Sequence, residues 1–311
     1  MTTIMAISDT HISHNSPRWS ECERVLTWFA EEACRGADLV LHCGDLFDRA
    51  ASTKDREFAH WWVGQVTAHC PLVLIRGNHD PVGEITMLQA HATVHPCHTA
   101  ETPDVIAVAG VVVQCLPWPR LGELAARAGE SGLALEERAR AALGDVLRGL
   151  SAEARDTKAW ADQTVILATH TLITGAVTSH GQPLVGGEMV VGLADLALAG
   201  ADVVIAGHIH KPQEWEHNGV RMLYCGSPFR TAFGEHEAKS VVRILDGAHG
   251  LRVERVETPA QRMVDVDARW VVAGSYFHFG NGRPLGVTDA QVRFRYTVAS
   301  EHREMARVEA A

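Results

Sequence analysis

The side chains of this sequence with the clearest chemical meaning follow short apolar runs. Five such runs have the length and aliphatic composition of buried strands, and each is followed by polar side chains that can bind metal. These side chains belong to Asp9 and His11, to Asp45, to Asn78 and His79, to His170, and to His208 and His210. Carboxylate, amide and imidazole groups in combination suit Mn, Fe, Zn or similar divalent ions. The pattern therefore predicts metal chemistry.

Two of these motifs have the same spacing. Asp9 and His11 are two residues apart, and so are His208 and His210. Side chains two apart on extended backbone share a face, so we expect Asp9 and His11 to bind one ion, and His208 and His210 repeat the same geometry. Asn78 follows a glycine that allows a sharp turn at the end of its strand. The motifs are therefore expected on loops at strand ends.

The full set of side chains favours two metal ions over one. Asp45 is the natural bridging carboxylate, and Asp48, three residues later, is expected to orient the loop. Two ions about 3.5–4 Å apart can hold a phosphoryl oxygen, activate a bridging water and stabilise an in-line displacement. A single histidine is more commonly a satisfied core or surface residue, but five separate placements at strand ends argue against that interpretation. The sequence therefore predicts a dinuclear centre.

The strands that carry these motifs alternate with helices. The first three strands and the two helices between them form βαβ units that present acids on one rim, where open α/β sheets bind ligands. Strands are expected over residues 3–7, 38–43, 72–75, 105–116 (two strands about Gly110), 164–168 and 202–206, and helices over 18–35, 54–69, within 120–160 (one amphipathic helix) and over 193–199. His180, in a glycine-rich loop, is expected to face solvent or substrate. The order of elements predicts an α/β fold.

Composition limits the class of protein. At 311 residues, with 46% hydrophobic and 21% charged residues, the chain is typical of a globular protein with a sizeable core. Its formal net charge of −10 argues against broad adhesion to nucleic acid or anionic membranes, although a local basic groove is compatible with it. The 7 scattered cysteines are expected to be reduced core residues. Without an apolar run of about 18 residues or a signal-like N-terminus, the protein is expected to be cytoplasmic.

In order along the chain the motifs read DxH, GDxxD, GNHD, a histidine after a strand, and GHxH. With these motifs the sequence resembles the calcineurin-like metallophosphoesterase superfamily over roughly residues 4–210. The resemblance implies a four-layer α/β/β/α sandwich and two divalent metal ions. It implies that one ion is held by Asp9, His11, Asp45 and His210, and the other by Asp45, Asn78, His170 and His208. His79 would then face the leaving group as proton donor or transition-state stabiliser.

A run of residues after the last histidine motif resembles one subfamily within this superfamily. It reads Tyr-x-Gly-Ser-Pro from Tyr224, then Phe-x-Glu ending at Glu235, then Lys239, and is similar to the run found in SbcD-type DNA repair nucleases. Gly44–Asp48 and Leu116–Trp118 fit the same subfamily. The resemblance implies a metal-dependent phosphodiesterase that cleaves DNA as an exonuclease or endonuclease in repair or recombination. We expect Mn²⁺ as its metal, with Fe, Zn or Mg as alternatives.

The C-terminal part departs from that subfamily. We expect a catalytic domain over residues 1–257 and a short, reduced capping-like region over 258–311, which leaves little room to dock a coiled-coil ATPase of the SbcC type. The sequence leaves open whether the protein binds such an ATPase and whether it forms a homodimer. A strand-like stretch, Val292–Val298, alternates Arg293 and Arg295 with Phe294 and Tyr296. This alternation could contact phosphates and stack on the bases of DNA, or mark an edge strand with one solvated face.

Two other functions compete with the nuclease. The first is a phosphatase or phosphodiesterase acting on small nucleotides or phosphoproteins. A closed pocket would favour that function, whereas a shallow basic groove would favour DNA. The second is a scaffold without activity, which would be expected to lack metal ligands or the proton donor. Because no such residue is missing from the sequence, we favour an enzyme.

Overall fold

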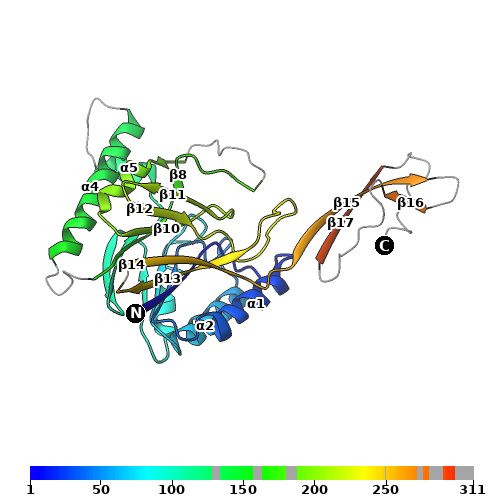
Figure 1. Ribbon diagram of the computed structural model, residues 1–311, viewed down its shortest axis with the longest axis horizontal. Coiled ribbons are helices and arrows are strands. Elements are labelled where there is room, and N and C mark those ends of the chain that lie inside the picture. The colour runs from blue at the N-terminus through cyan, green and yellow to red at the C-terminus, as the bar shows by residue number, and fades with distance from the viewer. Residues whose placement is uncertain are drawn as a thin grey trace.

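Two six-stranded sheets face each other in the computed structural model, and helices cover their outer faces (Figure 1). The structure describes residues 1–127, 134–156, 163–179, 188–248, 250–271, 276–279 and 290–297. This arrangement confirms the predicted α/β class and the order of its layers, which is helix, sheet, sheet and helix.

The first sheet contains three of the predicted motif strands. In spatial order its strands are β14 (Gly250–Glu257), β13 (Ser240–Gly247), β1 (Thr2–Ile7), β2 (Leu39–His42), β3 (Leu72–Ile75) and β4 (Cys97–Ala100). β1 to β4 run parallel, and β13 pairs antiparallel with β1. The carboxyl ends of β1, β2 and β3 therefore meet at one edge of the sheet.

The second sheet contains the other two motif strands, β7 and β10. In spatial order its strands are β11 (Gln213–His217), β12 (Val220–Tyr224), β10 (Val203–Gly207), β7 (Val165–His170), β6 (Val111–Leu116) and β5 (Asp104–Val108). The four inner strands run parallel, and β11 and β5 pair antiparallel at the edges. Two short strands, β8 (Leu172–Ile173) and β9 (Val190–Val191), pair separately. The strands about Gly110 confirm the predicted hairpin.

Alternation of side chains along the strands divides the core into layers. On β1, Ile4 and Ala6 point between the two sheets, whereas Met5 and Ile7 point toward the helices. The first sheet is covered by α1 (Trp19–Trp28) and α2 (Thr53–Thr67), and the second by α3 (Leu121–Arg127), α4 (Leu135–Asp156) and α5 (Leu193–Leu196). Because both faces of each sheet bury apolar side chains, polar motifs can gather only at the strand ends. None of the described helices is long and apolar enough to span a bilayer.

The helix predictions are confirmed with one exception. The predicted helix over 18–35 is present as α1 and a π-helical turn, Phe29–Ala33, which ends shortly before Gly36 with its positive φ of 77°. The exception is the region 120–160, where the predicted amphipathic helix is present as α4 but α3 is an additional helix that was not predicted. Residues 128–133 between them lie outside the described part of the chain.

The C-terminal strands form a separate three-stranded sheet, which we call the arm and which projects from the sandwich (Figure 1). Its strands are β15 (Arg262–Val271), β16 (Tyr276–Phe279) and β17 (Ala290–Thr297), with β15 in the middle. β17 is thus an edge strand, and its Arg293 pairs with Asp265 of β15 through contacts of 2.5 and 2.9 Å. The side chains of Phe294 and Tyr296 lie outside the described part. The domain boundary at residue 257 stays a prediction.

Asp55 secures the start of α2, the helix that precedes the third motif strand. Its carboxylate accepts hydrogen bonds from the backbone N–H of Ser52 at 2.7 Å and from that of His14 at 2.5 Å. Because Asp55→Ala removes both the capping box and the tether to the loop after β1, we expect it to lower the free energy of unfolding by about 1–2 kcal/mol. Urea denaturation measures this change. Glu57→Ala, on the exposed face of the same helix, should cost less than about 0.5 kcal/mol, and equal losses in the two variants would contradict the role of Asp55.

Candidate metal centre

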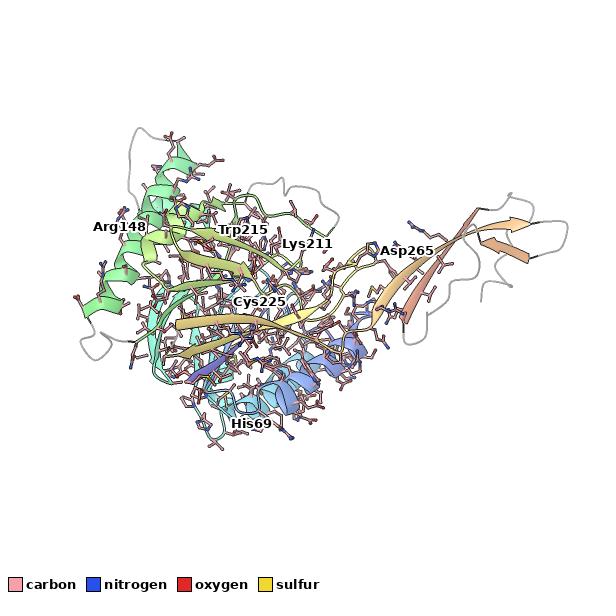
Figure 2. The ribbon with its side chains drawn as sticks, in the orientation of Figure 1. His69, Arg148, Lys211, Trp215, Cys225 and Asp265 are labelled. Atoms are coloured by element: carbon pink, nitrogen blue, oxygen red, sulfur yellow. The ribbon has the colours of Figure 1, made fainter. Side chains whose placement is uncertain are left out.

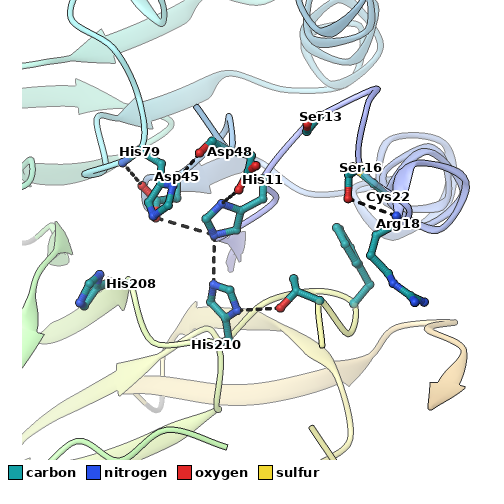
Figure 3. A pocket seen from close by; sticks show the side chains of 12 residues that line it. His11, Ser13, Ser16, Arg18, Cys22, Asp45, Asp48, His79, His208 and His210 are labelled. Atoms are coloured by element: carbon teal, nitrogen blue, oxygen red, sulfur yellow. Dashed lines mark hydrogen bonds and ion pairs between the residues drawn. The ribbon is translucent and has the colours of Figure 1, made fainter. Parts of the chain in front are cut away.

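The predicted site residues lie together where the ends of five strands converge. The first sheet supplies Asp9 and His11 after β1, Asp45 after β2, and Asn78 and His79 after β3. The second sheet supplies His170 at the end of β7, and His208 and His210 after β10. Figure 3 shows His11, His79 and His210 around a pocket at this edge of the sandwich. The site is therefore built by both sheets, and neither sheet alone contains it.

Backbone strain is concentrated at these residues. Asp9, His11, Asp45 and His208 have positive φ angles of 54°, 42°, 55° and 102°. Residues other than glycine rarely adopt this region, at a cost of about 1–3 kcal/mol each. The prediction of extended backbone through Asp9 and His11 is therefore wrong. Left-handed turns direct these side chains, and backbone bonds to the neighbouring loop hold the turns, including one of 3.0 Å from the N–H of Asp9 to the Gly44 carbonyl.

Two glycines let the motif loops approach one another closely. A side chain on Gly77 would collide with the backbone nitrogen and the carboxylate of Asp45, and one on Gly207 would collide with the carbonyl oxygen of Cys43. Backbone atoms cannot move aside as a flexible side chain can. Glycine at both positions is therefore a condition for bringing the loops after β3 and β10 against the loop after β2.

The ligand atoms form two clusters that share Asp45. In the first cluster, atoms of Asp9, His11 and His210 lie within 4.8 Å of one another, and Nε2 of His11 lies 3.0 Å from Nε2 of His210. In the second, Oδ1 of Asn78 lies 2.9 Å from Nε2 of His170 and 3.3 Å from Nδ1 of His208. Oδ2 of Asp45 lies 3.8 Å from Nε2 of His11 and 3.3 Å from Nε2 of His170. The Asp45 carboxylate therefore lies between the two clusters, and Asp9 also lies near Asp45 and His170.

In their neutral forms, the histidines of these clusters turn lone pairs toward one another and toward acceptor oxygens. Nδ1 of His170 donates to the Cys43 carbonyl at 2.8 Å, so Nε2 of a neutral ring has only a lone pair. That lone pair faces oxygens of Asn78 and Asp45, which are acceptors as well. The facing Nε2 atoms of His11 and His210 can share one proton at most. A divalent cation in each cluster would bind these lone pairs, so the residues fit the metals that the family implies.

The protonation states of the histidines agree with metal binding. Burial disfavours both charged forms, yet the Asp45 carboxylate raises the pKa of His170 to about 9, and His170 helps to hold the pKa of Asp45 well below its usual range. Burial and His210 lower the pKa of His11 to about 4, and burial and His170 lower that of His208 to about 4. His11 and His208 are therefore neutral near pH 7, the form that binds metal, and His170 holds a proton that a cation would displace.

His79 has a different environment from the other histidines. It is exposed and lines a cavity of about 300 Å³ together with His11, Asp45 and His210. Its backbone N–H donates to Oδ1 of Asp45 at 2.9 Å, and its Nδ1 donates to the carbonyl oxygen of Asp48 at 2.6 Å. Nε2 is therefore free for a molecule in the cavity, to which the imidazolium form could donate a proton.

Asp48 and Asp80 hold the loops of the site together. The carbonyl of Asp48 positions His79, as the loop-orienting role predicts, and its carboxylate lies 3.6 Å from Nδ1 of His11. The sequence predicted no role for Asp80, although it belongs to the GNHD motif. Its carboxylate accepts from the backbone N–H of Phe47 at 2.9 Å and of Gly77 at 2.8 Å, which ties the loops after β2 and β3. Burial and Asp45 raise the pKa of Asp80 to about 6.

Sequence reasoning missed two glutamates next to the candidate ligands. Oε1 of Glu235 lies 3.9 Å from Nδ1 of His210 and accepts from the hydroxyl of Thr231 at 2.7 Å. Oε2 of Glu188 lies 3.2 Å from Nε2 of His208. Glu235 belongs to the Phe-x-Glu run, which could have pointed to it, whereas Glu188 follows a glycine-rich loop with no motif. His180, in that same loop, lies outside the described residues.

Lys239 anchors the segment that follows the last histidine motif. It is 1% exposed, and its Nζ lies 2.6 Å from Oε2 of Glu235 and 2.9 Å from Oε1 of Glu237. It also donates to Oγ of Ser227 at 3.0 Å and to the carbonyl oxygen of His210 at 3.2 Å. A buried cation thus connects Glu235 to the backbone of His210 and fixes the position of both.

A family model for calcineurin-like phosphoesterases matches residues 2–212 of the chain. The chain therefore belongs to the calcineurin-like phosphoesterase family, whose members bind a dinuclear metal centre. This result agrees with the two clusters that share Asp45. No curated protein matches the sequence significantly.

Several solved structures resemble the fold at low sequence identity. GAP50 from Plasmodium is 14% identical, with a TM-score of 0.46, over 82% of this chain and 84% of that one. Phosphopantetheinyl hydrolase from Mycobacterium tuberculosis is 18% identical, with a TM-score of 0.42, over 73% and 90% of the two chains. TT1561 from Thermus thermophilus is 16% identical, with a TM-score of 0.45, over 82% and 98%. Similarity at this level says nothing about the substrate.

Removal of the buried cation tests the network around Lys239. Lys239→Met leaves Glu235 and Glu237 without their shared counter-charge, so we expect the free energy of unfolding to fall by about 3–5 kcal/mol in urea denaturation. Lys54→Met makes the same change at an exposed position and should cost less than about 0.5 kcal/mol. A loss for Lys239→Met no larger than that of Lys54→Met would show that the network contributes little to stability.

Proposed function

We propose that the protein is a phosphodiesterase dependent on a dinuclear metal centre, and that it acts on DNA as a nuclease of the SbcD type. The observation that carries the diesterase assignment is a second cavity of about 280 Å³ beside the candidate ligands. It meets the first cavity at His208 and His210, but its other walls include Ser179 and Glu188. A phosphodiester has two substituents on phosphorus, and the two cavities could each receive one of them.

The case for DNA rests on further observations. The segment after the last histidine motif, which is similar to that of SbcD-type nucleases, lies against the site through Glu235 and Lys239. No described element has the form of a groove-reading helix, so contacts to phosphate and sugar would dominate over base readout. Cleavage without sequence preference is therefore the behaviour we propose.

A second candidate is a phosphodiesterase that acts on small nucleotides. A volume of about 300 Å³ is at the lower end of the range for small-molecule sites. The second cavity also contains Glu188 and Glu235, whose carboxylates would repel a polyanion. The balance between the two candidates therefore depends on whether the arm or a partner supplies further contacts to DNA.

The roles of the side chains follow from their positions. When bound, the two ions would supply Lewis-acid polarisation of the phosphoryl group and a water nucleophile at neutral pH. Asp9, His11 and His210 would hold one ion, Asn78, His170 and His208 the other, and Asp45 both. Nε2 of His79 would donate a proton to the leaving oxygen, while the Asp48 carbonyl fixes the imidazole ring through Nδ1. We propose Mn²⁺ as the metal, whose preference for carboxylate and carbonyl oxygens is met by Asp9, Asp45 and Asn78.

The proposal also includes the interaction partners expected of an SbcD-type nuclease. The arm, with β17 as an edge strand, is the described part of the predicted capping-like region. It would help to hold DNA, and a coiled-coil ATPase or a second copy of the chain would extend that surface. None of these partners is needed for the diesterase assignment itself.

Metal-dependent hydrolysis tests the proposed function. Purified protein with Mn²⁺ is offered end-labelled single- and double-stranded DNA and, separately, bis-p-nitrophenyl phosphate. We expect DNA shortening that Asp45→Ala abolishes, because that variant loses the carboxylate common to both clusters. Hydrolysis of the small diester alone would favour the phosphodiesterase that acts on small nucleotides. Hydrolysis of neither substrate would contradict the phosphodiesterase assignment.

A comparison of variants separates metal binding from proton donation. His79→Asn should lower kcat by about 10²–10⁴-fold with metal content near that of the unchanged protein, because His79 donates a proton but binds no ion. Asp45→Ala should lose both activity and metal, measured by elemental analysis. His69→Asn, at the surface beyond α2 (Figure 2), is the matched control and should change neither. Full activity of His79→Asn would exclude the proton-donor role.

A further inference from the structure

The cavity beside the candidate metal ligands continues to a cation that the proposed reaction does not use. One part of its wall is formed by His11, His79 and His210, and another by Ser16 and Arg18. In Figure 3 the Arg18 side chain lies on the side of the pocket away from His208, with the His11 and His210 rings between them. A molecule bound at the ligands could therefore extend along the cavity to Arg18.

Among the described residues the guanidinium of Arg18 makes no direct ion pair, and the Glu21 carboxylate acts on it only through its electrostatic field. Its Nη1 is buried without a hydrogen-bond partner, and its Cζ lies over the ring of Phe233, 5.7 Å from the centroid. Glu21, three residues along the chain, already accepts from Arg24 at 2.8 Å and from the backbone N–H of Gln261 at 2.6 Å. An arginine stays charged at neutral pH, and a partly buried charge without a partner is costly. An anion in the cavity would provide the missing partner.

The wall between the ligands and Arg18 suits a sugar and a base more than a metal or a peptide. Ser13 and Ser16 supply hydroxyl groups that can bond to sugar or phosphate oxygens, and Phe229 supplies a buried apolar surface. The volume of about 300 Å³ leaves space for a substituent of roughly the size of one nucleoside. The lining therefore changes from metal ligands through hydroxyls and an aromatic ring to a guanidinium.

We propose that Arg18 binds a second phosphate of the substrate, the one that neighbours the phosphate being cleaved in a nucleotide chain. The inference rests on the proposed function and specifies its substrate class: a nucleotide chain with at least two phosphates, rather than a simple diester. A guanidinium matches the oxygens of a phosphate with two parallel N–H donors, so one side chain can select for that group. Arg18 is then a specificity residue, and His79 and the candidate metal ligands perform the same chemistry on either substrate.

Three dinucleotides test this subsite directly. Thymidine dinucleotide is compared without a terminal phosphate, with a 5′-phosphate and with a 3′-phosphate, using the Mn²⁺-loaded protein. We expect kcat/KM for one of the two phosphorylated forms to exceed that of the unphosphorylated form by about tenfold or more. In Arg18→Gln this preference should fall below about threefold, and Arg18→Lys, which keeps the charge but not the planar fork, should restore part of it.

Arg148→Gln is the matched control, since it removes the same charge from the exposed face of α4, remote from the cavity (Figure 2). It should keep the full preference for the second phosphate. Absence of the preference in the unchanged protein, or the same preference in Arg18→Gln, would overturn the subsite. Thermal unfolding of Arg18→Gln within a few degrees of the unchanged protein shows that a lost preference is not a folding defect.

Equilibrium binding separates failure of the subsite from failure of the proposed function. If neither DNA, bis-p-nitrophenyl phosphate nor any dinucleotide is hydrolysed, the phosphodiesterase proposal fails, yet isothermal titration calorimetry with the same three dinucleotides still decides the role of Arg18. A phosphorylated form should bind the unchanged protein about tenfold more tightly than it binds Arg18→Gln. Equal affinities in that comparison would reject the subsite as well.

Discussion

The structure of the site depends on the position of one carboxylate, that of Asp45. One of its oxygens faces Nε2 of His11 and of His170, which belong to different clusters, and the other accepts the backbone N–H of His79. This position requires a left-handed backbone at Asp45 itself and a glycine at Gly77, because any side chain there would occupy the place of the carboxylate. An anion so deeply buried needs positive charge around it, which protonated His170 supplies in part and divalent cations would supply in full.

In the sandwich fold, the edges formed by the carboxyl ends of the strands of both sheets meet at this carboxylate. β1, β2 and β3 deliver acids, an amide and the imidazoles of His11 and His79, whereas β7 and β10 deliver imidazoles alone, so the site is complete only when both sheets are packed. The unfavourable backbone conformation at four of the loop residues is offset by the apolar layer between the sheets. It is also offset by carboxylates such as that of Asp80, which hold the loops together through hydrogen bonds to backbone N–H groups. Metal binding and folding are therefore expected to be coupled.

The sequence predicted the elements and the convergence of the ligands well, for a physical reason. Apolar runs with a polar motif at each end determine which strands are buried and where their loops emerge, and both are local properties. The sequence could not show that left-handed turns, rather than extended backbone, aim Asp9 and His11, because φ depends on bonds to a distant loop. The roles of Glu235 and Lys239 and the nearness of Glu188 to His208 also depend on tertiary contacts, which local pattern does not encode.

The central claim is that two divalent cations share Asp45, and anomalous diffraction from crystals soaked in Mn²⁺ tests it most directly. The account predicts two anomalous peaks at the edge of the sandwich, both in contact with the Asp45 carboxylate, one next to His11 and His210 and the other next to Asn78 and His170. A single peak, or peaks that do not contact Asp45, would contradict the account.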